Sequence, residues 1–373
     1  MKEYHYERRN KSFFKFFVQT KMSLTGCTKF IIPGINYAQR YCLSRFNMLK
    51  IEFKQYGCLI NGEIKYSFHQ RFIDLINPSN GKTFAQAADL TSQDFEYAID
   101  TAKHTADQGM WSSMLVSERG IYLKKLASLI RKNARELADL ESMNCGKTLK
   151  QTTFIDIPTC ADTFNHFSNI SDELAARENK IQDPVKSKTV REPMGVVACI
   201  IPWNYPLVIT AWKIAPALMA GNCVILKPSS LACASVLRLA ELMMEADFPK
   251  GVIQVLVTTD HAVAQKIVED PRIDMLSFTG GTETGQKFMA LASQTVKKIS
   301  FELGGKSPNI IFDDCDREAA LGGSLSAIFM NQGAMCTAGS RLLVEEKIYD
   351  QFVGELVERT KRLKIGDAMD YQT

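Results

Sequence analysis

Between residues 195 and 278 the chain alternates short apolar runs with amphipathic stretches, and this alternation restricts the fold more than any other feature. We expect strands at 195–201, 222–226, 251–257 and 273–278, and helices at 207–218, 232–246 and 261–269. Strand–helix–strand order at this spacing predicts parallel strands joined by right-handed crossovers. The strand runs are continuously apolar, as strands covered on both faces are. The sequence therefore predicts an α/β fold with a doubly wound sheet that binds its ligand at the carboxyl ends of the strands.

The residues before this unit predict further regular structure. We expect a strand at 73–77 with a turn after it, helices at 91–106, 117–145 and 156–174, and an extended polar segment at 186–192. In the longest helix the apolar residues recur at helical spacing. Gly146 then provides the residue type that commonly ends a helix.

Composition narrows the class of protein. The 373 residues are enough for two domains with a sizeable core. Residues 1–54 carry eleven Lys/Arg against three Glu, so a net +4 for the whole chain leaves −4 for the remainder, which argues against a nucleic-acid partner. No apolar run approaches the roughly 18 residues of a membrane helix. Ten cysteines without metal-ligand spacing predict a reducing, cytoplasmic setting and no metal.

The first 56 residues differ from the rest of the chain because they are basic, aromatic and poor in acid. They lack the apolar core and the small-residue cleavage site of a signal peptide. We interpret 1–56 as an extension outside the fold. One explanation is a misassigned start, with Met22 or Met48 as the true initiator; the other is a targeting extension.

Five short tracts carry the chemistry. Glu302 lies on a glycine-rich turn, and Cys336 follows 34 residues later among small residues, which pairs a candidate base with a candidate nucleophile. The tracts are Pro-Trp-Asn-Tyr-Pro at 202–206, Lys-Pro-Ser-Ser at 227–230, Phe-Thr-Gly-Gly-Thr at 278–282, Phe-Glu-Leu-Gly-Gly-Lys at 301–306 and Gly-Ala-Met-Cys-Thr-Ala-Gly-Ser-Arg at 333–341. Their order and spacing resemble the aldehyde dehydrogenase superfamily from about Gly57 onward, most of all the betaine aldehyde dehydrogenases.

A nucleotide cofactor is suggested by two features. Glycines at 280–285 follow a strand and precede a helix, whose first N–H groups can bind an anion, although an ordinary turn explains them equally. Lys227 ends a strand, where it either meets a ligand or lies in solvent. No G-x-G-x-x-G fingerprint is present, but the family that the chain resembles binds NAD or NADP without it. The resemblance assigns cofactor binding to Ile201, Trp203, Lys227, Ser229, Ser230, Gly280, Gly281, Thr284, Leu303 and Gly304.

Ser230, Asp260, Ala264, Met330 and Ala334 depart from the family pattern, and two of them bear on the cofactor through charge. Ser230 stands where many NAD-preferring relatives have a glutamate that repels a 2′-phosphate, so NADP becomes admissible. Asp260 stands in a loop where relatives carry glycines near the cofactor. Its carboxylate would repel a phosphate there unless it points to water.

The resemblance implies a reaction through a cysteine thioester. Cys336 attacks the aldehyde, and Asn204 with the Cys336 backbone N–H stabilises the oxyanion. Hydride passes to the nicotinamide, and water activated by Glu302 releases the acid. The residues alone also allow Asn204 to be satisfied within its turn and Glu302 to be solvated.

The sequence restricts the identity of the aldehyde less than it restricts the type of reaction. Tyr205 and Trp212 match two aromatic positions of betaine aldehyde dehydrogenases, where rings receive a trimethylammonium by cation–π contact, but both rings can equally be packing residues. Betaine aldehyde therefore leads, followed by an aminoaldehyde or an aliphatic aldehyde.

The expected organisation is a cofactor-binding domain at 57–298 and the first part of a catalytic domain at 299–373. Within the first, residues 165–192 resemble the hairpin through which the family forms dimers or tetramers. Relatives continue beyond a point equivalent to Thr373, so we expect unpaired strands, exposed apolar surface and no appreciable dehydrogenase activity from residues 1–373 alone. The alternative is a non-catalytic remnant of a split gene that binds nucleotide.

Overall fold

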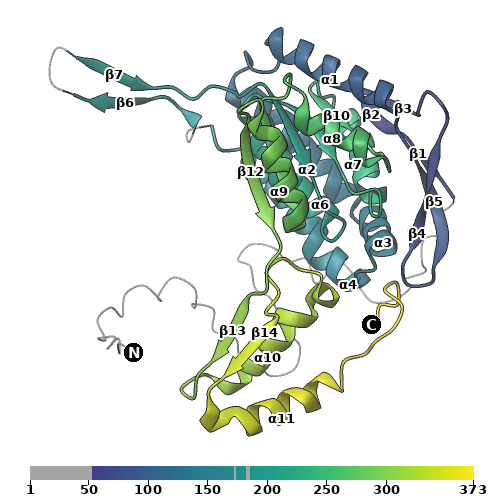
Figure 1. Cartoon of the computed structure of the whole chain (residues 1–373), viewed down its shortest axis with the longest axis vertical. Coiled ribbons are helices and arrows are strands. Elements are labelled where there is room, and N and C mark those ends of the chain that lie inside the picture. Colours follow the sequence, from purple (N-terminus) through teal and green to yellow (C-terminus); the bar gives the residue numbers. More distant parts are fainter. Residues whose placement is uncertain (1–52, 172–173, 182–184) are drawn as a thin grey trace. The chain divides into compact units, whose positions relative to one another are not determined.

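The computed structural model describes residues 53–171, 174–181 and 185–373 (Figure 1). Residues 51–373 form one compact unit. Most of the basic extension, residues 1–52, lies outside the described residues.

A seven-stranded sheet forms the centre of this unit, in the order β12-β11-β8-β9-β10-β2-β3. The first five strands of this order run parallel, β2 pairs antiparallel with β10, and β3 pairs antiparallel with β2. The strands are β2 (Cys58–Ile60), β3 (Glu63–Lys65), β8 (Val196–Ile200), β9 (Cys223–Lys227), β10 (Ile253–Val255), β11 (Met275–Gly280) and β12 (Lys298–Leu303). Every residue of β8 is buried, as the continuous apolar runs predicted.

Helices cover both faces of the sheet, which confirms the doubly wound fold (Figure 1). On one face, α6 (Pro206–Met219) contacts α7 (Ala234–Glu245); on the other, α8 (His261–Glu269) contacts α9 (Thr282–Ser293) and α1 (Ser92–Asp107). The chain leaves β8 toward β9 and β10 and then returns to β11 on the opposite side of β8. The strand order therefore reverses between β8 and β11, and a crevice at such a point is where open α/β sheets bind ligands.

Two of the expected helices are shorter than predicted. The segment expected as one helix at 117–145 is α2 (Val116–Lys132) and α3 (Ala134–Cys145). Asn133 separates them because its side chain donates to Leu129 O at 2.8 Å and so competes with the helical bonds. The helix expected at 156–174 is α5 (Ile157–Phe167), which follows α4 (Leu149–Gln151) and a π-helical turn, Thr152–Asp156.

The fold begins earlier than the expected boundary at residue 57. β1 (Gln55–Tyr56) pairs with β5 (Lys82–Ala88), which also pairs with β4 (Phe72–Asn77). Tyr56 is buried, so the last residues of the supposed extension belong to the folded unit. A periodicity argument missed them because two residues are too few to show alternation.

The polar segment at 186–192 contains the predicted extended structure. β7 (Lys186–Thr189) pairs antiparallel with β6 (Arg177–Lys180), and nearly all of both strands is exposed (Figure 1). Assembly through this hairpin stays a prediction.

Residues after β12 form a smaller layer around a second core. β13 (Pro308–Ile311) pairs parallel with β14 (Arg341–Val344), against α10 (Arg317–Phe329) and α11 (Tyr349–Thr360). This core is centred on Ile311, Leu321 and Phe352. Ile310, Phe312 and Leu343 are each more than half exposed, which agrees with the expected apolar surface.

Gly195 gives a direct test of this packing. Its φ is +119°, and an added Cβ would lie 2.2 Å from Asp274 Oδ2, the atom that accepts the Val196 N–H. We expect Gly195→Ala to lower the free energy of unfolding by about 2 kcal/mol or more, measured by urea denaturation. Gly322→Ala is the matched control, because Gly322 lies within α10 with no atom within 4 Å of the added methyl. That variant is expected to gain about 0.5–1 kcal/mol. Equal stability of the two variants would contradict the structure.

Candidate active site

The predicted cofactor residues follow four neighbouring parallel strands. Ile201 and Trp203 come after β8, and Lys227 to Ser230 come at the end of β9. Gly280 ends β11 and Gly281 follows it, while Leu303 ends β12 and Gly304 follows it. Because β12, β11, β8 and β9 are adjacent and parallel, all four tracts lie at one carboxyl edge, on both sides of the point where strand order reverses. The edge brings together tracts that are up to about a hundred residues apart in sequence.

The helix after β11 begins with free backbone donors. Gly281 is the N-cap of α9, and no side chain caps the helix there. An added Cβ on Gly280 would lie 2.4 Å from the Phe278 ring, whereas one on Gly281 would meet nothing within 4 Å. Thr284, in the first turn, is exposed. Uncapped N–H groups with open space before them suit the pyrophosphate of a dinucleotide.

The end of β9 carries a partly buried cation. Burial lowers the pKa of the Lys227 ammonium below its ordinary value. Lys227 Nζ donates to Pro228 O at 3.3 Å, which leaves further N–H donors for a ligand. Ser229 Oγ accepts the Leu231 N–H, and Ser230 is half-buried beside it. These groups fit the hydroxyl-rich end of a nucleotide.

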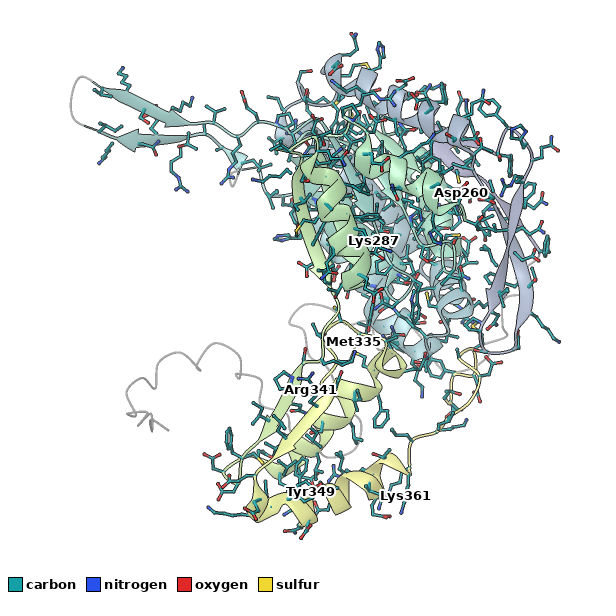
Figure 2. All side chains as sticks on the ribbon, viewed as in Figure 1. Asp260, Lys287, Met335, Arg341, Tyr349 and Lys361 are labelled. Atoms are coloured by element: carbon teal, nitrogen blue, oxygen red, sulfur yellow. The ribbon has the colours of Figure 1, made fainter. Side chains whose placement is uncertain are left out.

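Asp260 has a structural partner. It is the N-cap of α8, and its Oδ1 accepts the N–H groups of Ala262 and Val263 at 2.8 and 3.3 Å (Figure 2). The carboxylate therefore accepts the free N–H groups in the first turn of its own helix, which is the ordinary role of aspartate at an N-cap.

Cys336 lies in an exposed loop between Gly333 and β14, next to Met335 (Figure 2). Among the eight cysteines in the described part of the chain, it alone is exposed. Burial raises the pKa of the Cys199, Cys223 and Cys233 thiols to about 12, so these are unreactive packing residues. The exposure of Cys336 is what a nucleophile needs.

Asn204 is held against this loop. Its Nδ2 donates to Ala334 O at 2.8 Å, two residues before the thiol. Asn331 Nδ2 donates to Asn204 O and Ala334 O, at 3.1 and 3.0 Å, from the other side. A side-chain amide has two N–H groups, so Asn204 keeps one for a developing oxyanion. The arrangement joins the turn after β8 to the loop of the nucleophile.

Glu302 lies three residues before Gly305, whose turn passes beside the loop that contains Cys336. It lies in β12 opposite Thr279 and is exposed. An added Cβ on Gly305 would lie 3.8 Å from Cys336 O, so the glycine-rich turn after β12 passes beside the cysteine backbone. The carboxylate and the thiol thus come from segments in contact.

Tyr205 and Trp212, expected as a pair around the substrate, occupy different surroundings. The Lys147 ammonium lies 3.4 Å from the Tyr205 ring centroid, so only the other face of this ring is left for a second cation. Trp212 comes two turns later in α6, about 10 Å further along the axis. It lines an open groove of about 440 Å³ with five residues of α5: Thr159, Asp162, Thr163, His166 and Phe167.

Sequence reasoning missed a buried charged cluster behind the Tyr205 turn. Lys147 is fully buried and bonded to Asp156, with Glu141 4.0 Å away. Burial raises the pKa of Glu141 to about 7, and its Oε1 accepts the Leu207 N–H in the first turn of α6. In the sequence this cluster is marked only by Lys147, directly after the helix-ending Gly146. An isolated lysine is usually exposed, so the sequence predicts a surface position for it.

Gln151 and Asn331 were also missed. Gln151 Nε2 donates to Tyr205 Oη at 3.2 Å, and Gln151 Oε1 accepts the Asn331 N–H at 3.1 Å. Asn331 is buried although it precedes an exposed loop. Neither residue belongs to the motifs in the sequence, so no pattern marked them.

Residues 53–171, 174–181 and 185–373 contain neither a metal-binding cluster nor a membrane-spanning helix. These residues contain no group of three or more His, Cys, Asp or Glu side chains that could hold a metal. In the same part of the chain no helix is both long and apolar enough to cross a membrane.

Comparison with known proteins agrees with this arrangement. The aldehyde dehydrogenase family matches residues 66–373. Betaine aldehyde dehydrogenase of Bacillus subtilis (strain 168) is 42% identical over 317 residues, 84% of this chain and 64% of the relative. Human mitochondrial 10-formyltetrahydrofolate dehydrogenase is 38% identical over 323 residues, 85% of this chain and 35% of the relative.

Solved structures show the same fold. Betaine aldehyde dehydrogenase from Staphylococcus aureus, in complex with NAD+, superimposes with a TM-score of 0.82 at 37% identity, over 85% of this chain and 63% of that one. An aldehyde dehydrogenase from Burkholderia cenocepacia gives the same TM-score and identity over 86% and 65%. The chain thus spans less than two thirds of the length of these relatives. With the family match covering most of its residues, the chain belongs to the aldehyde dehydrogenase family.

Proposed function

We propose that this protein takes part in the NAD(P)-dependent oxidation of an aldehyde to a carboxylic acid through a thioester on Cys336. The observation that supports this most is the hydrogen bond from Asn204 Nδ2 to Ala334 O. It holds a candidate oxyanion donor next to the only exposed cysteine in the described residues, at the sheet edge where the cofactor tracts end.

The proposed chemistry assigns one task to each group. The Cys336 thiolate adds to the aldehyde carbon, and the resulting oxyanion accepts N–H groups from Asn204 and the Cys336 backbone. The bound nicotinamide supplies a hydride acceptor. Glu302 then takes a proton from water as that water attacks the thioester carbonyl, which releases the acid and restores the thiol.

The cofactor site fits either nicotinamide dinucleotide. Lys227 provides a cation, the uncapped start of α9 provides N–H donors, and the glycines at 281 and 304 provide space. The Staphylococcus aureus relative was solved with NAD+. Ser230 presents no carboxylate to repel a 2′-phosphate, so we expect NADP to bind comparably.

A cationic aldehyde, betaine aldehyde first, is the proposed substrate. The groove beside Trp212 combines two aromatic side chains with the Asp162 carboxylate, and these are groups that attract a trimethylammonium. Asp162 is also paired with Arg131, which weakens its attraction. Relatives of similar identity carry both betaine aldehyde and 10-formyltetrahydrofolate in their names. Because these names differ, they do not select one aldehyde, and an aminoaldehyde or aliphatic aldehyde is the alternative substrate.

The setting of the reaction is proposed on physical grounds. The eight cysteines in the described part of the chain are unpaired, which suits a reducing compartment such as the cytoplasm. The exposed β6–β7 hairpin is the proposed contact for a dimer or tetramer. A chain that binds dinucleotide without acylating Cys336 would instead be the non-catalytic remnant.

Cys336→Ala is expected to abolish hydride transfer while cofactor affinity stays within about twofold, because only the thiol forms the adduct. NAD(P)H formation is followed with enzyme in excess over aldehyde, so that a slow single turnover is visible. Cys315→Ala, at a half-buried thiol in the same layer, is the control and should behave as wild type. An unchanged rate in the Cys336 variant would remove this residue from the mechanism.

Ser230→Glu is expected to weaken NADP binding on the order of tenfold more than NAD binding, because its carboxylate would face the 2′-phosphate. Ser230→Gln has nearly the same size without the charge and should change both affinities alike. Calorimetric titration of both cofactors measures the two ratios. If the Glu and Gln variants give the same NADP/NAD ratio, Ser230 does not lie at the ribose.

A further inference from the structure

The turn before the nucleophile loop has an unfavourable backbone. Asn331, Gln332 and Gly333 are all left-handed, with φ of 49°, 54° and 79°. Glycine adopts this conformation freely, but residues with a Cβ do so at a cost, and a run of two is unusual. Such strain persists only where neighbouring groups hold it, and it concentrates at functional sites.

The groups that hold this turn come from residues 146–151, far away in sequence. Gln151 Oε1 accepts the Asn331 N–H at 3.1 Å. The Gln332 side-chain amide donates to Gly146 O. Both left-handed residues that carry a Cβ, Asn331 and Gln332, are thus bound to one short segment, at the end of α3 and in α4.

The same segment also holds the aromatic residue beside Asn204. Gln151 Nε2 donates to Tyr205 Oη at 3.2 Å, so a single side chain bridges Tyr205 and Asn331. Lys147 lies over the Tyr205 ring and fixes it from a second direction. The bridge therefore sets the spacing between the turn after β8 and the turn before Cys336.

The position of Asn331 determines the position of the reacting groups. Its buried side chain donates to Ala334 O and to Asn204 O. Displacing Asn331 would loosen both contacts, and Cys336 lies only two residues after Ala334. A misplacement of about 1 Å can cost on the order of 100-fold in rate.

We propose that Gln151 is a positioning residue: by bridging Tyr205 and Asn331 it holds the left-handed turn and aligns the Cys336 thiol with the Asn204 amide. Gln151 has no contact with Cys336 among its hydrogen bonds, so it acts through Asn331. The inference rests on the proposed function only in taking Cys336 as the nucleophile and Asn204 as the oxyanion donor.

Acyl transfer without a cofactor tests this alignment. In the reaction with p-nitrophenyl acetate, the Cys336 thiolate adds to the ester carbonyl and p-nitrophenolate leaves with the bonding electrons, giving an acetyl thioester. This step needs both the thiol and the oxyanion donors. Alkylation by iodoacetamide displaces iodide and needs the thiol alone. Both products are located on the Cys336 peptide by mass spectrometry.

Gln151→Leu removes both hydrogen bonds of the bridge. We expect acylation of Cys336 to slow by about tenfold or more, with alkylation changed by less than about threefold. Gln151→Glu keeps an acceptor for the Asn331 N–H and replaces the donor to Tyr205 Oη with an acceptor for the Tyr205 O–H, so it should acylate within about threefold of wild type. Gln265→Leu is the surface control, because Gln265 is exposed in α8 and bonds only to Glu269.

A general loosening of the fold would change both reactions together, expose buried thiols to iodoacetamide and lower the melting temperature in proportion. That result, or an unchanged acylation rate in Gln151→Leu, would overturn the proposal. Failure of wild-type Cys336 to acylate would overturn it as well. If wild type acylates and Gln151→Leu loses acylation selectively, the positioning role stands even where no NAD(P)H is formed, and only the proposed dehydrogenase function fails.

Discussion

The hydrogen bond between Asn204 Nδ2 and Ala334 O is the contact on which the candidate site depends. Asn204 follows β8 in the central sheet, whereas Ala334 lies between α10 and β14, the elements packed around the second, smaller core. This contact joins the two segments together with the hydrogen bond from Asn331 Nδ2 to Asn204 O. The glycine-rich turn after β12 also approaches this loop, because a Cβ added at Gly305 would lie 3.8 Å from Cys336 O. Directional hydrogen bonds fix geometry more closely than such an approach does.

The sheet makes this contact possible by its topology. The parallel strands β12, β11, β8 and β9 deliver their polar ends to one edge. The chain reverses direction across the sheet between β8 and β11, and the Asn204 turn begins directly at this point. The buried cluster of Glu141, Lys147 and Asp156 supports the turn from behind. One Asp156 carboxylate oxygen has no hydrogen-bond partner in this cluster, so burying these charges costs free energy. The cluster holds Lys147 against the Tyr205 ring.

The parts that the sequence predicted are those with a strong period or a specific residue type. Continuous apolar runs identified β8, β9 and β11. The break at Asn133 was missed because one side-chain hydrogen bond overrides an otherwise helical pattern. Gln151 and Asn331 were missed for a different reason: their roles come from contacts between segments 180 residues apart, and no local pattern encodes those. Tyr205 was predicted either as a ring at the substrate or as a packing residue, and the lysine over its face was not visible in the sequence.

Trapping the thioester tests the central claim, that Cys336 is the nucleophile held against Asn204. Glu302→Gln retains thiol and amide but loses the group proposed to activate water, so its acylated form should accumulate. This variant is mixed with aldehyde and NAD+ or NADP+, quenched with acid, and digested for mass spectrometry. The account predicts an acyl group on the peptide containing Cys336, in proportion to the NAD(P)H formed, and no such adduct when Asn204 is also replaced by Ala. NAD(P)H formed without an adduct on Cys336, or with an adduct on another cysteine, would contradict it.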